Sequence, residues 1–415
     1  MCGGVVFMYQ SMYNSHPIMK TDRIIVIVLD GLGVGELPDA ASYGDTGANT
    51  LEHVVGAIHR PSLPNLQRLG LMRMLPDAEC HGDASMPEGR FGKMGEISRG
   101  KDSTTGHWEM MGVITRKPFP TYPRGFPKNL IRRLEQRIGT KTLGNIVASG
   151  TAIIKDLGAQ HLRTGYPIVY TSVDSVFQIA ANESVVPLQK LYRICAVARR
   201  LLQGRHAMGR VIARPFTGKP GHFRRTPGRR DFTLPPPSPT VLDRIHRGGG
   251  RTIGIGKIGD LFSNRGLSRV IHTVGNADGI GKTAQAMRQE KKAKLIFTNL
   301  VDTDMLYGHR NDTAGYYRCL REFDRALPTI LAALAPNDIL FISSDHGCDP
   351  TTPGTDHTRE YVPLLVTGPA LRGNVSLGTR KTLADLGQTV LELLGYPKMK
   401  EGQSFARELT GKAWP

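Results

Sequence analysis

The chain has 415 residues, of which 40% are hydrophobic and 22% charged, and its formal net charge is +18. This composition is typical of a folded globular enzyme, and the length favours two domains over one. No apolar run approaches the roughly 20 residues that a membrane helix needs, and the five scattered cysteines form no CxxC pair, which argues against a disulfide scaffold or thiolate zinc site and favours a reducing, cytoplasmic location.

The N-terminal segment, residues 1–20, is predicted to be a disordered tail. It lacks the basic start and the sustained apolar core of a signal peptide. The first strand-like run begins only at Arg23, and Met19 would also serve as a start. Two interpretations of residues 1–18 therefore stay open, a tail and a stretch that is not made in the cell.

Continuous apolar runs predict buried parallel strands, because strands with one solvated face would alternate instead. The runs are 23–30, 252–260, 294–302 and 338–345, and each ends in an Asp. In open α/β sheets, ligands bind at the carboxyl ends of the strands. Helix capping would account for one or two of these acids, so we expect several of them to meet at one edge of the sheet.

Two proline-rich segments divide the chain. Four prolines fall within 118–127 and four more within 235–239, and such segments act as stiff spacers. We therefore predict an α/β core, with a mostly parallel sheet flanked by helices, made of 21–118 and 236–415. A smaller inserted α/β cap would occupy 119–235. The apolar spacing of 313–334 predicts a helix that Pro328 kinks or divides.

The positive charge is concentrated in and just after this insert. Between Arg193 and Arg251 there are 14 Lys and Arg against two Asp. Aromatic residues are sparse there and no nucleic-acid motif is present, so we expect a lobe that handles phosphorylated small molecules rather than nucleic acid. A solvated basic face is the simpler alternative.

Four polar segments carry the candidate chemistry. They are VLDGLGVGELPDA with Asp30, GKDSTTGHWEMMG with three hydroxyl residues, NLVDTDMLYGHRND with Asp302, Asp304 and His309, and SSDHGCDPTTPGTDH with Asp345, His346 and His357. The first has glycines spaced GxGxG rather than GxGxxG, which disfavours a dinucleotide site. Oxygen and nitrogen donors without thiolates suit manganese, zinc or iron, and two clustered ions could assist phosphoryl transfer.

These segments resemble the phosphopentomutases of the alkaline phosphatase superfamily. DPTTPGTDHTREYVPLL is the most specific, and PIVYTSVDSVFQIAANE and GRVIARPFTG in the insert agree with it. The resemblance covers the chain from about Arg23 to the C-terminus. It implies interconversion of α-D-ribose 1-phosphate and D-ribose 5-phosphate, and of the 2-deoxy sugars, through a phosphoenzyme and a bisphosphate. It also implies two Mn²⁺ ions and a glucose 1,6-bisphosphate or pentose 1,5-bisphosphate activator.

The resemblance also implies roles for individual residues. One ion would be held by Asp304, His309 and His357, and the other by Asp30, Asp345 and His346. The family's phosphorylated threonine falls at Ser103, with Thr104 as second choice. The substrate contacts would be Asp174, Arg210, Arg225 and Lys257.

Two departures from the family pattern concern the site itself. Ser103 replaces a threonine but offers the same hydroxyl, and Cys348 stands where the family usually has Asn. We interpret Cys348 as a small filler rather than a soft metal ligand. Sugar phosphates are the expected partners, the expected state is a monomer, and no membrane partner is expected. The alternatives are another metal-dependent phosphatase or phosphomutase of the superfamily, a nucleic-acid-binding protein, and a non-catalytic family member.

Overall fold

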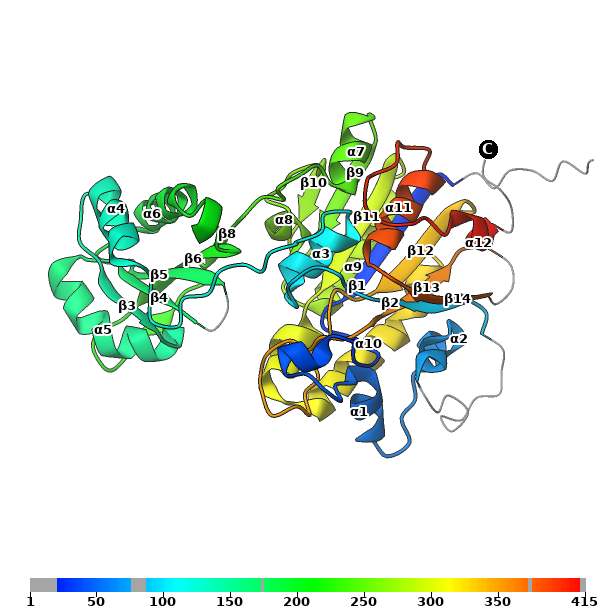
Figure 1. The fold of residues 1–415 in the computed structure, drawn as a ribbon, viewed down its shortest axis with the longest axis horizontal. Coiled ribbons are helices and arrows are strands. Elements are labelled where there is room, and N and C mark those ends of the chain that lie inside the picture. Colours follow the sequence, from blue (N-terminus) through cyan, green and yellow to red (C-terminus); the bar gives the residue numbers. More distant parts are fainter. Residues whose placement is uncertain (1–20, 76–86, 173–174, 372–374, 411–415) are drawn as a thin grey trace, which may run out of the picture.

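The computed structural model describes residues 21–75, 87–172, 175–371 and 375–410. The predicted tail and Asp174 lie outside the described residues. In the larger lobe, eight strands form one sheet in the order β10-β9-β11-β1-β12-β13-β2-β14 (Figure 1). Their bounds are β1 Arg23–Leu29, β2 Arg90–Met94, β9 Arg251–Ile255, β10 Arg269–Ile271, β11 Ala293–Leu300, β12 Asp338–Ser343, β13 Val362–Thr367 and β14 Val375–Arg380.

The sheet is mostly parallel, as predicted from the continuous apolar runs. β1 pairs in parallel with β11 on one side and with β12 on the other, and β9 extends the parallel array beyond β11. β13 runs antiparallel to both of its neighbours. The segments that follow β1, β11 and β12 therefore leave the sheet at the same edge.

One of the four predicted strands is partly wrong. The run 252–260 forms a strand only as far as Ile255, and Gly256 then turns the chain with a φ of 75°. Residues Ile258–Leu261 form the short helix α8, so Asp260 lies in a helix and not at a strand end. Glycine adopts this left-handed backbone conformation readily, which explains why the apolar pattern runs on while the strand does not.

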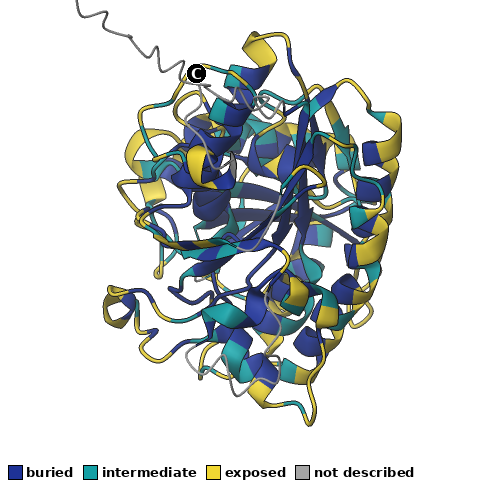
Figure 2. Ribbon diagram, turned by 90° about the vertical axis from the view of Figure 1, so that its right-hand side faces the viewer, coloured by how far each residue is buried: buried dark blue, intermediate teal, exposed yellow. Residues whose placement is uncertain are grey.

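Helices cover both faces of this sheet. Every residue of β1 is buried, and since successive side chains of a strand point to opposite faces, both faces must be covered. Ile25, Ile27 and Leu29 pack in one apolar cluster, and Ile24, Val26 and Val28 pack in the other. Figure 2 shows the buried strands between the helices. The helices of this lobe are α1 Thr50–Gly56, α2 Pro64–Arg68, α3 Ser103–Met110, α7 Val241–Arg247, α8, α9 Asn276–Gln289, α10 Thr313–Leu331, α11 Ala384–Leu393 and α12 Ala406–Thr410.

The long helix α10 is not divided at Pro328, contrary to one of the two predicted outcomes. Pro328 lies within its last turn and cannot donate to the carbonyl of Asp324, four residues earlier. The side-chain amide of Asn65 donates to that carbonyl instead, at 2.9 Å. The lost backbone bond is thus replaced, and the helix ends at Leu331 rather than at 334.

A second, smaller sheet has the order β3-β4-β5-β6-β7, with β8 also paired to β6. Its strands are β3 Leu143–Val147, β4 Ile168–Thr171, β5 Val176–Asn182, β6 Arg210–Thr217, β7 Arg224–Arg225 and β8 Arg230–Thr233. Helices α4 (Lys128–Ile138) and α6 (Leu188–Leu201) pack on one face, and α5 (Gly150–Thr164) packs on the other. Figure 1 shows this lobe beside the large sheet, joined to it by two extended connecting segments. All of it falls inside 119–235, and the exact domain boundaries stay a prediction.

Among the described residues, none of the helices has both the length and the apolar character needed to cross a membrane.

Candidate active site

Three strands of the large sheet deliver the candidate ligands to one edge. Asp30 follows β1 directly, Asp304 and His309 follow β11, and Asp345 and His346 follow β12. His357 lies in the loop that returns to β13. The adjacent parallel pairing of β11, β1 and β12 explains why residues more than 300 positions apart meet here.

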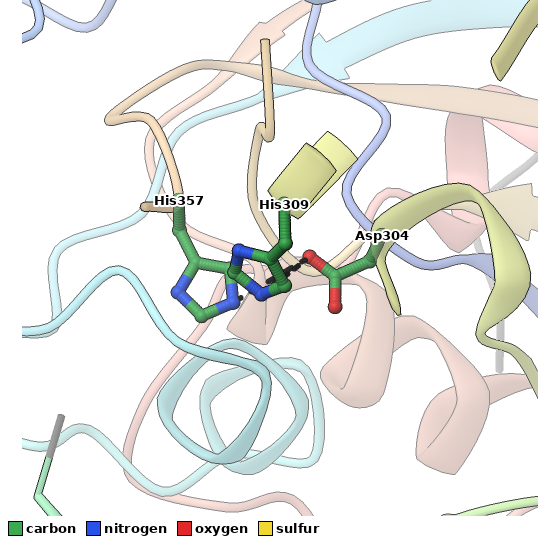
Figure 3. A group of neighbouring side chains, drawn as sticks. All are labelled: Asp304, His309 and His357. Atoms are coloured by element: carbon green, nitrogen blue, oxygen red, sulfur yellow. Dashed lines mark ion pairs between the residues drawn. The ribbon is translucent and has the colours of Figure 1, made fainter. Parts of the chain in front are cut away.

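Asp304, His309 and His357 form one compact group (Figure 3). Nε2 of His309 lies 3.4 Å from Oδ1 of Asp304, and Nε2 of His357 lies 3.5 Å from the same oxygen. The other ring nitrogen of His309, Nδ1, lies 2.6 Å from the carbonyl oxygen of Thr355. That contact orients the imidazole with Nε2 toward Asp304, which is how proteins usually hold a metal-binding histidine.

A second group contains Asp30, Asp304 and His346, with one potential ligand atom of each within 4.8 Å of the others. Nε2 of His346 lies 3.5 Å from Oδ1 of Asp30 and 3.3 Å from Oδ2 of Asp345. The structure therefore brings all six predicted ligands together. It differs from the predicted division in one respect, because Asp304 stands close to both groups.

These residues fit a pair of divalent cations. Oδ1 of Asp304 and Oδ2 of Asp345 are buried and have imidazole nitrogens 3.0–3.5 Å away, but among the described residues they make no hydrogen bond of good geometry. Leaving buried carboxylate oxygens without hydrogen-bond donors costs free energy, and a cation would satisfy them. The donor set of carboxylates and imidazoles, without a thiolate among the six, suits manganese, iron or zinc.

The electrostatics of the group also favour cations. Burial raises the pKa of Asp30 to about 6, the carboxylates of Asp345 and Asp304 add to this effect, and the Lys257 ammonium opposes it. Burial also acts to raise the pKa of Asp304, but the imidazoles of His357 and His309 outweigh it and the pKa ends below its usual range. Three buried carboxylates so close together need positive charge nearby.

The hydroxyl of Ser103 lies beside these ligands. Its Oγ is 3.5 Å from Oδ1 of Asp30 and 3.3 Å from Nε2 of His346. Ser103 is the first residue of α3, and Asp102 caps that helix by accepting hydrogen bonds from the backbone N–H groups of Thr104 and Thr105. The Thr104 side chain is buried, and within the described part of the chain its hydroxyl donates no hydrogen bond to the six ligands.

The predicted substrate contacts do not all meet. Arg210 and Lys257 line one cavity of about 510 Å³ between the lobes, and Arg210 also lies 3.8 Å from Asp231. Arg225 lines a different cavity within the small lobe and donates to Oγ1 of Thr151 at 2.9 Å. Asp174 lies outside the described residues.

Comparisons with known proteins identify the family. The chain is 55% identical, over 387 residues, to the phosphopentomutase of Caldanaerobacter subterraneus subsp. tengcongensis, and the match covers 93% of this chain and 98% of that protein. The chain belongs to the phosphopentomutase family. The phosphopentomutase of Carboxydothermus hydrogenoformans is also 55% identical, over 93% of this chain and 99% of its own length.

Family membership confirms the predicted enzyme class, an isomerase that transfers a phosphoryl group. Residues 245–398 match the Metalloenzyme superfamily, which agrees with metal dependence. Among solved structures, phosphoglycerate mutase of Leishmania mexicana aligns with 94% of this chain and 98% of its own, at 13% identity and a TM-score of 0.46. That likeness is too distant to add to the assignment.

Cys348 departs from the phosphopentomutase pattern and lies beside two of the ligands, Asp304 and His309. Its Sγ is 4.0 Å from Nδ1 of His309, the nitrogen that already faces Thr355. Burial raises the pKa of the thiol well above its usual range, which keeps it neutral. A Cβ added at Gly308 would meet this sulfur at 2.5 Å. These contacts favour the filler interpretation.

Sequence reasoning missed two residues that support the phosphopentomutase site. Nδ1 of His107 lies 3.0 Å from Oδ2 of Asp345 and 2.8 Å from the carbonyl oxygen of Ser103. Asn299 donates to Oδ2 of Asp30 at 2.8 Å. A signal for His107 was available, because it stands four residues after Ser103 and so shares its helix face. Asn299 lies inside β11, where nothing in an apolar run marks it.

Asp302 lies away from the ligands, although it belongs to the same segment as Asp304. Its Oδ2 accepts a hydrogen bond of 2.7 Å from the backbone N–H of Asn276, the first residue of α9. Asp302 does not cap the short helix that follows it, Thr303–Tyr307, so the capping explanation does not hold for it in that form, and its carboxylate contacts the start of α9 instead.

Proposed function

We propose that this phosphopentomutase interconverts α-D-ribose 1-phosphate and D-ribose 5-phosphate, and the 2-deoxy equivalents, with Ser103 as the residue that carries the phosphoryl group. The observation that carries this proposal is the position of the Ser103 hydroxyl, 3.3 Å from His346 and 3.5 Å from Asp30. A serine hydroxyl is a poor nucleophile unless neighbouring groups assist its ionisation.

Two Mn²⁺ ions are the proposed cofactors. Asp304, His309 and His357 would hold one, and Asp30, Asp345 and His346 the other, with Asp304 near enough to both to take part in either. Bound there, the ions would favour the ionised hydroxyl and neutralise charge on the transferring phosphoryl group.

The chain's own residues then account for the transfer. In the phosphorylated enzyme, the free hydroxyl of the sugar phosphate attacks phosphorus, loses its proton, and displaces the Ser103 oxygen. The resulting bisphosphate turns around, and Ser103 takes its other phosphate. The position of Ser103 at the start of α3 favours a phosphate there, because helix N-termini attract anions. Glucose 1,6-bisphosphate or a pentose 1,5-bisphosphate would phosphorylate Ser103 at the outset.

The small lobe is proposed as a cap that holds the phosphate not being transferred. Arg210 and Lys257 share a cavity and would bind it first, and Arg guanidinium groups suit phosphate geometry. Arg225 would contact the sugar phosphate once the cap moves toward the large lobe, and Asp174 remains a proposed contact from the sequence. Exclusion of water matters here, because water attacking phosphorylated Ser103 would turn the mutase into a phosphatase.

We further propose that the enzyme works as a monomer in the cytoplasm on small sugar phosphates.

The test is a turnover assay with ribose 1-phosphate, Mn²⁺ and a catalytic amount of glucose 1,6-bisphosphate. Ribose 5-phosphate and free phosphate are followed in the same reaction, for the native enzyme and the variants Ser103→Ala and Thr104→Val. We expect isomerisation without phosphate release, lost in Ser103→Ala and kept in Thr104→Val. Phosphate release without isomerisation would overturn the mutase proposal, and full activity of Ser103→Ala would overturn the nucleophile.

A further inference from the structure

We propose that the outer face of helices α4 and α6, in the small lobe, binds the backbone of duplex nucleic acid. The starting observation is a charge imbalance between the lobes. Residues 119–235 contain 20 Lys and Arg against five Asp and Glu, a net charge of +15 out of the +18 of the whole chain. The rest of the chain is therefore close to neutral, although it is more than twice as long.

The structure gathers many of these cations on one face. α4 and α6 pack side by side on the same face of the small sheet, and their apolar sides form one cluster with it. Eight cations on the two helices and the following turn are exposed to solvent. They are Lys128, Arg132, Arg133, Arg137, Lys190, Arg193, Arg200 and Arg205. We call this set the helical basic face.

These charges lack acidic partners within the described residues, since none of the eight takes part in an ion pair there. Glu135 is the single acid on the two helices, and its Oε1 accepts hydrogen bonds from the backbone and the hydroxyl of Thr142. Burial, together with the guanidinium groups of Arg205 and Arg133, lowers the pKa of His206. Arg133 of α4 and Arg205, just after α6, therefore both act on His206, and a bound polyanion would reduce the repulsion among these positive charges.

The sugar phosphate does not explain this face. None of the eight cations lines the cavity that contains Arg210 and Lys257, and none lines the cavity of Arg225. The sequence-based expectation assigned the whole basic segment to phosphate handling. Five cations of that segment line the two cavities, whereas Arg193, Arg200 and Arg205 belong to the helical basic face; the five are Arg210, Arg224, Arg225, Arg229 and Arg230.

Chemical details favour nucleic acid over other polyanions. Arginines outnumber lysines 15 to 5 in residues 119–235, and the guanidinium group matches phosphate better than the ammonium group does. The exposed large apolar side chains of the described residues are Ile97, Ile146, Val147, Val274 and Met305, none of them on α4 or α6, so the face has no groups to insert into a lipid surface.

The face also favours a duplex over a single strand. Proteins that bind single strands stack the bases on exposed aromatic rings. Tyr192, the aromatic residue on α6, is half-buried, with Arg230 over its ring and its hydroxyl donating to the carbonyl oxygen of Gly228. Phe126 and Phe177 pack against each other in the buried cluster. Binding would therefore rest on phosphate contacts and would not depend on base sequence.

The test measures binding of a fluorescent RNA or DNA duplex to the full-length enzyme by anisotropy, at several salt concentrations. The cap variant combines Arg132→Gln, Arg133→Gln, Arg193→Gln and Arg200→Gln. The control variant removes four exposed cations from the large lobe, through Arg288→Gln, Lys291→Gln, Lys292→Gln and Arg325→Gln. Both lower the net charge equally, and both are expected to keep mutase activity.

We expect the native enzyme and the control to bind the duplex alike, with an affinity that falls steeply as salt rises. The cap variant should bind at least about 10-fold more weakly, and the slope of log affinity against log salt should shrink by about 3.6, since each of the four lost phosphate contacts removes about 0.9. Equal binding by the two variants would overturn the proposal. So would binding to anionic lipid vesicles in the absence of any binding to the duplex.

Discussion

The Ser103 hydroxyl and the His346 imidazole lie 3.3 Å apart, although 243 residues separate them in the sequence. The first stands at the start of α3 and the second just after β12. Their contact places the proposed nucleophile against a proposed metal ligand.

Ser103→Thr should keep most of the mutase activity. Threonine supplies the same hydroxyl and is the residue that the family's pattern places here, and Ser103 is only half-buried, which leaves room for a methyl group. We expect kcat within about 10-fold of native, since the nucleophile is unchanged. Steady-state kinetics of Ser103→Thr beside Ser103→Ala measure this, and an inactive threonine variant with intact metal content would contradict it.

Asp304→Asn should impair binding of both metal ions, because Asp304 belongs to both ligand groups. Asp302→Asn is the matched control, since Asp302 lies two residues away and accepts a hydrogen bond from Asn276. Metal content after dialysis, measured by atomic emission, should fall below one ion per chain in Asp304→Asn and stay native in the control. If Asp304→Asn lost only one of the two ions, Asp304 would belong to one ligand group and not to both.

His107 is predicted to position Asp345. Its Nδ1 lies 3.0 Å from the Asp345 carboxylate, and both side chains are fully buried. Removing a residue that orients a metal ligand typically weakens metal affinity 10–100-fold. Titration of the metal-free His107→Ala variant with Mn²⁺ should show that loss, and activity should return at high Mn²⁺. Native metal affinity in a folded variant would leave His107 without this role.

Arg359 should matter for stability far more than an exposed arginine does. It is 2% exposed and contacts Glu96, which is 3% exposed, while its other N–H groups reach Asp39 and the carbonyl oxygens of Glu96 and Gly100. Breaking a buried pair from one side costs about 3–5 kcal/mol in the free energy of unfolding.

The control for Arg359→Met is Arg68→Met, which breaks an exposed pair with Glu88 and should cost at most about 1 kcal/mol. Urea unfolding of the large lobe, followed by the fluorescence of buried Trp108, compares the two. Equal losses would mean that the Arg359 network contributes little.

The small lobe should lose stability in mild acid because of His161. Burial lowers the pKa of this imidazole below 6.5, and its Nε2 accepts a hydrogen bond of 2.8 Å from the Asn182 N–H while Nδ1 faces the Tyr166 carbonyl at 2.7 Å. The unfolded chain therefore binds the proton more readily than the folded chain. The stabilisation is complete above about pH 6.5 and declines as the pH falls below it.

His161→Gln should be less stable than native at pH 8 but lose less on going to pH 5.5, as measured by thermal unfolding at both values. The exposed His222 serves as the control, and His222→Gln should keep the native pH dependence. If the stability of His161→Gln changed with pH as that of the native protein does, His161 would not be the cause of the loss of stability in acid.

Much of the fold could be predicted from the sequence because the parallel strands are buried on both faces. The run 23–30 becomes β1, with all seven of its strand residues buried. The same signal failed at 252–260, because apolar side chains suit both a strand and the helix that follows Gly256. Pattern alone could not place Asn65 beside Asp324, a contact that lets α10 continue past Pro328.

The candidate site, too, could be predicted from the sequence only in part. Carboxylates and imidazoles at strand ends were recognisable, because the topology of parallel strands brings those ends together. What separates Asp304 from Asp302 is the direction of each side chain at the end of β11, and no residue pattern specifies that. His107 and Asn299 act through contacts across the sheet edge, and Arg210 and Arg225 line different cavities although both are cations of one lobe.

The most direct test of the account is to locate the phosphate on the enzyme itself. The protein is incubated with Mn²⁺ and glucose 1,6-bisphosphate, quenched, digested with trypsin, and the peptide spanning residues 102–116 is fragmented in a mass spectrometer. We predict one phosphate, on Ser103, which is still there after excess ribose 5-phosphate is added before the quench, because the bisphosphate returns a phosphate to Ser103 in each turnover. Phosphate on Thr104, or an enzyme that turns over without ever carrying phosphate on this peptide, would contradict it.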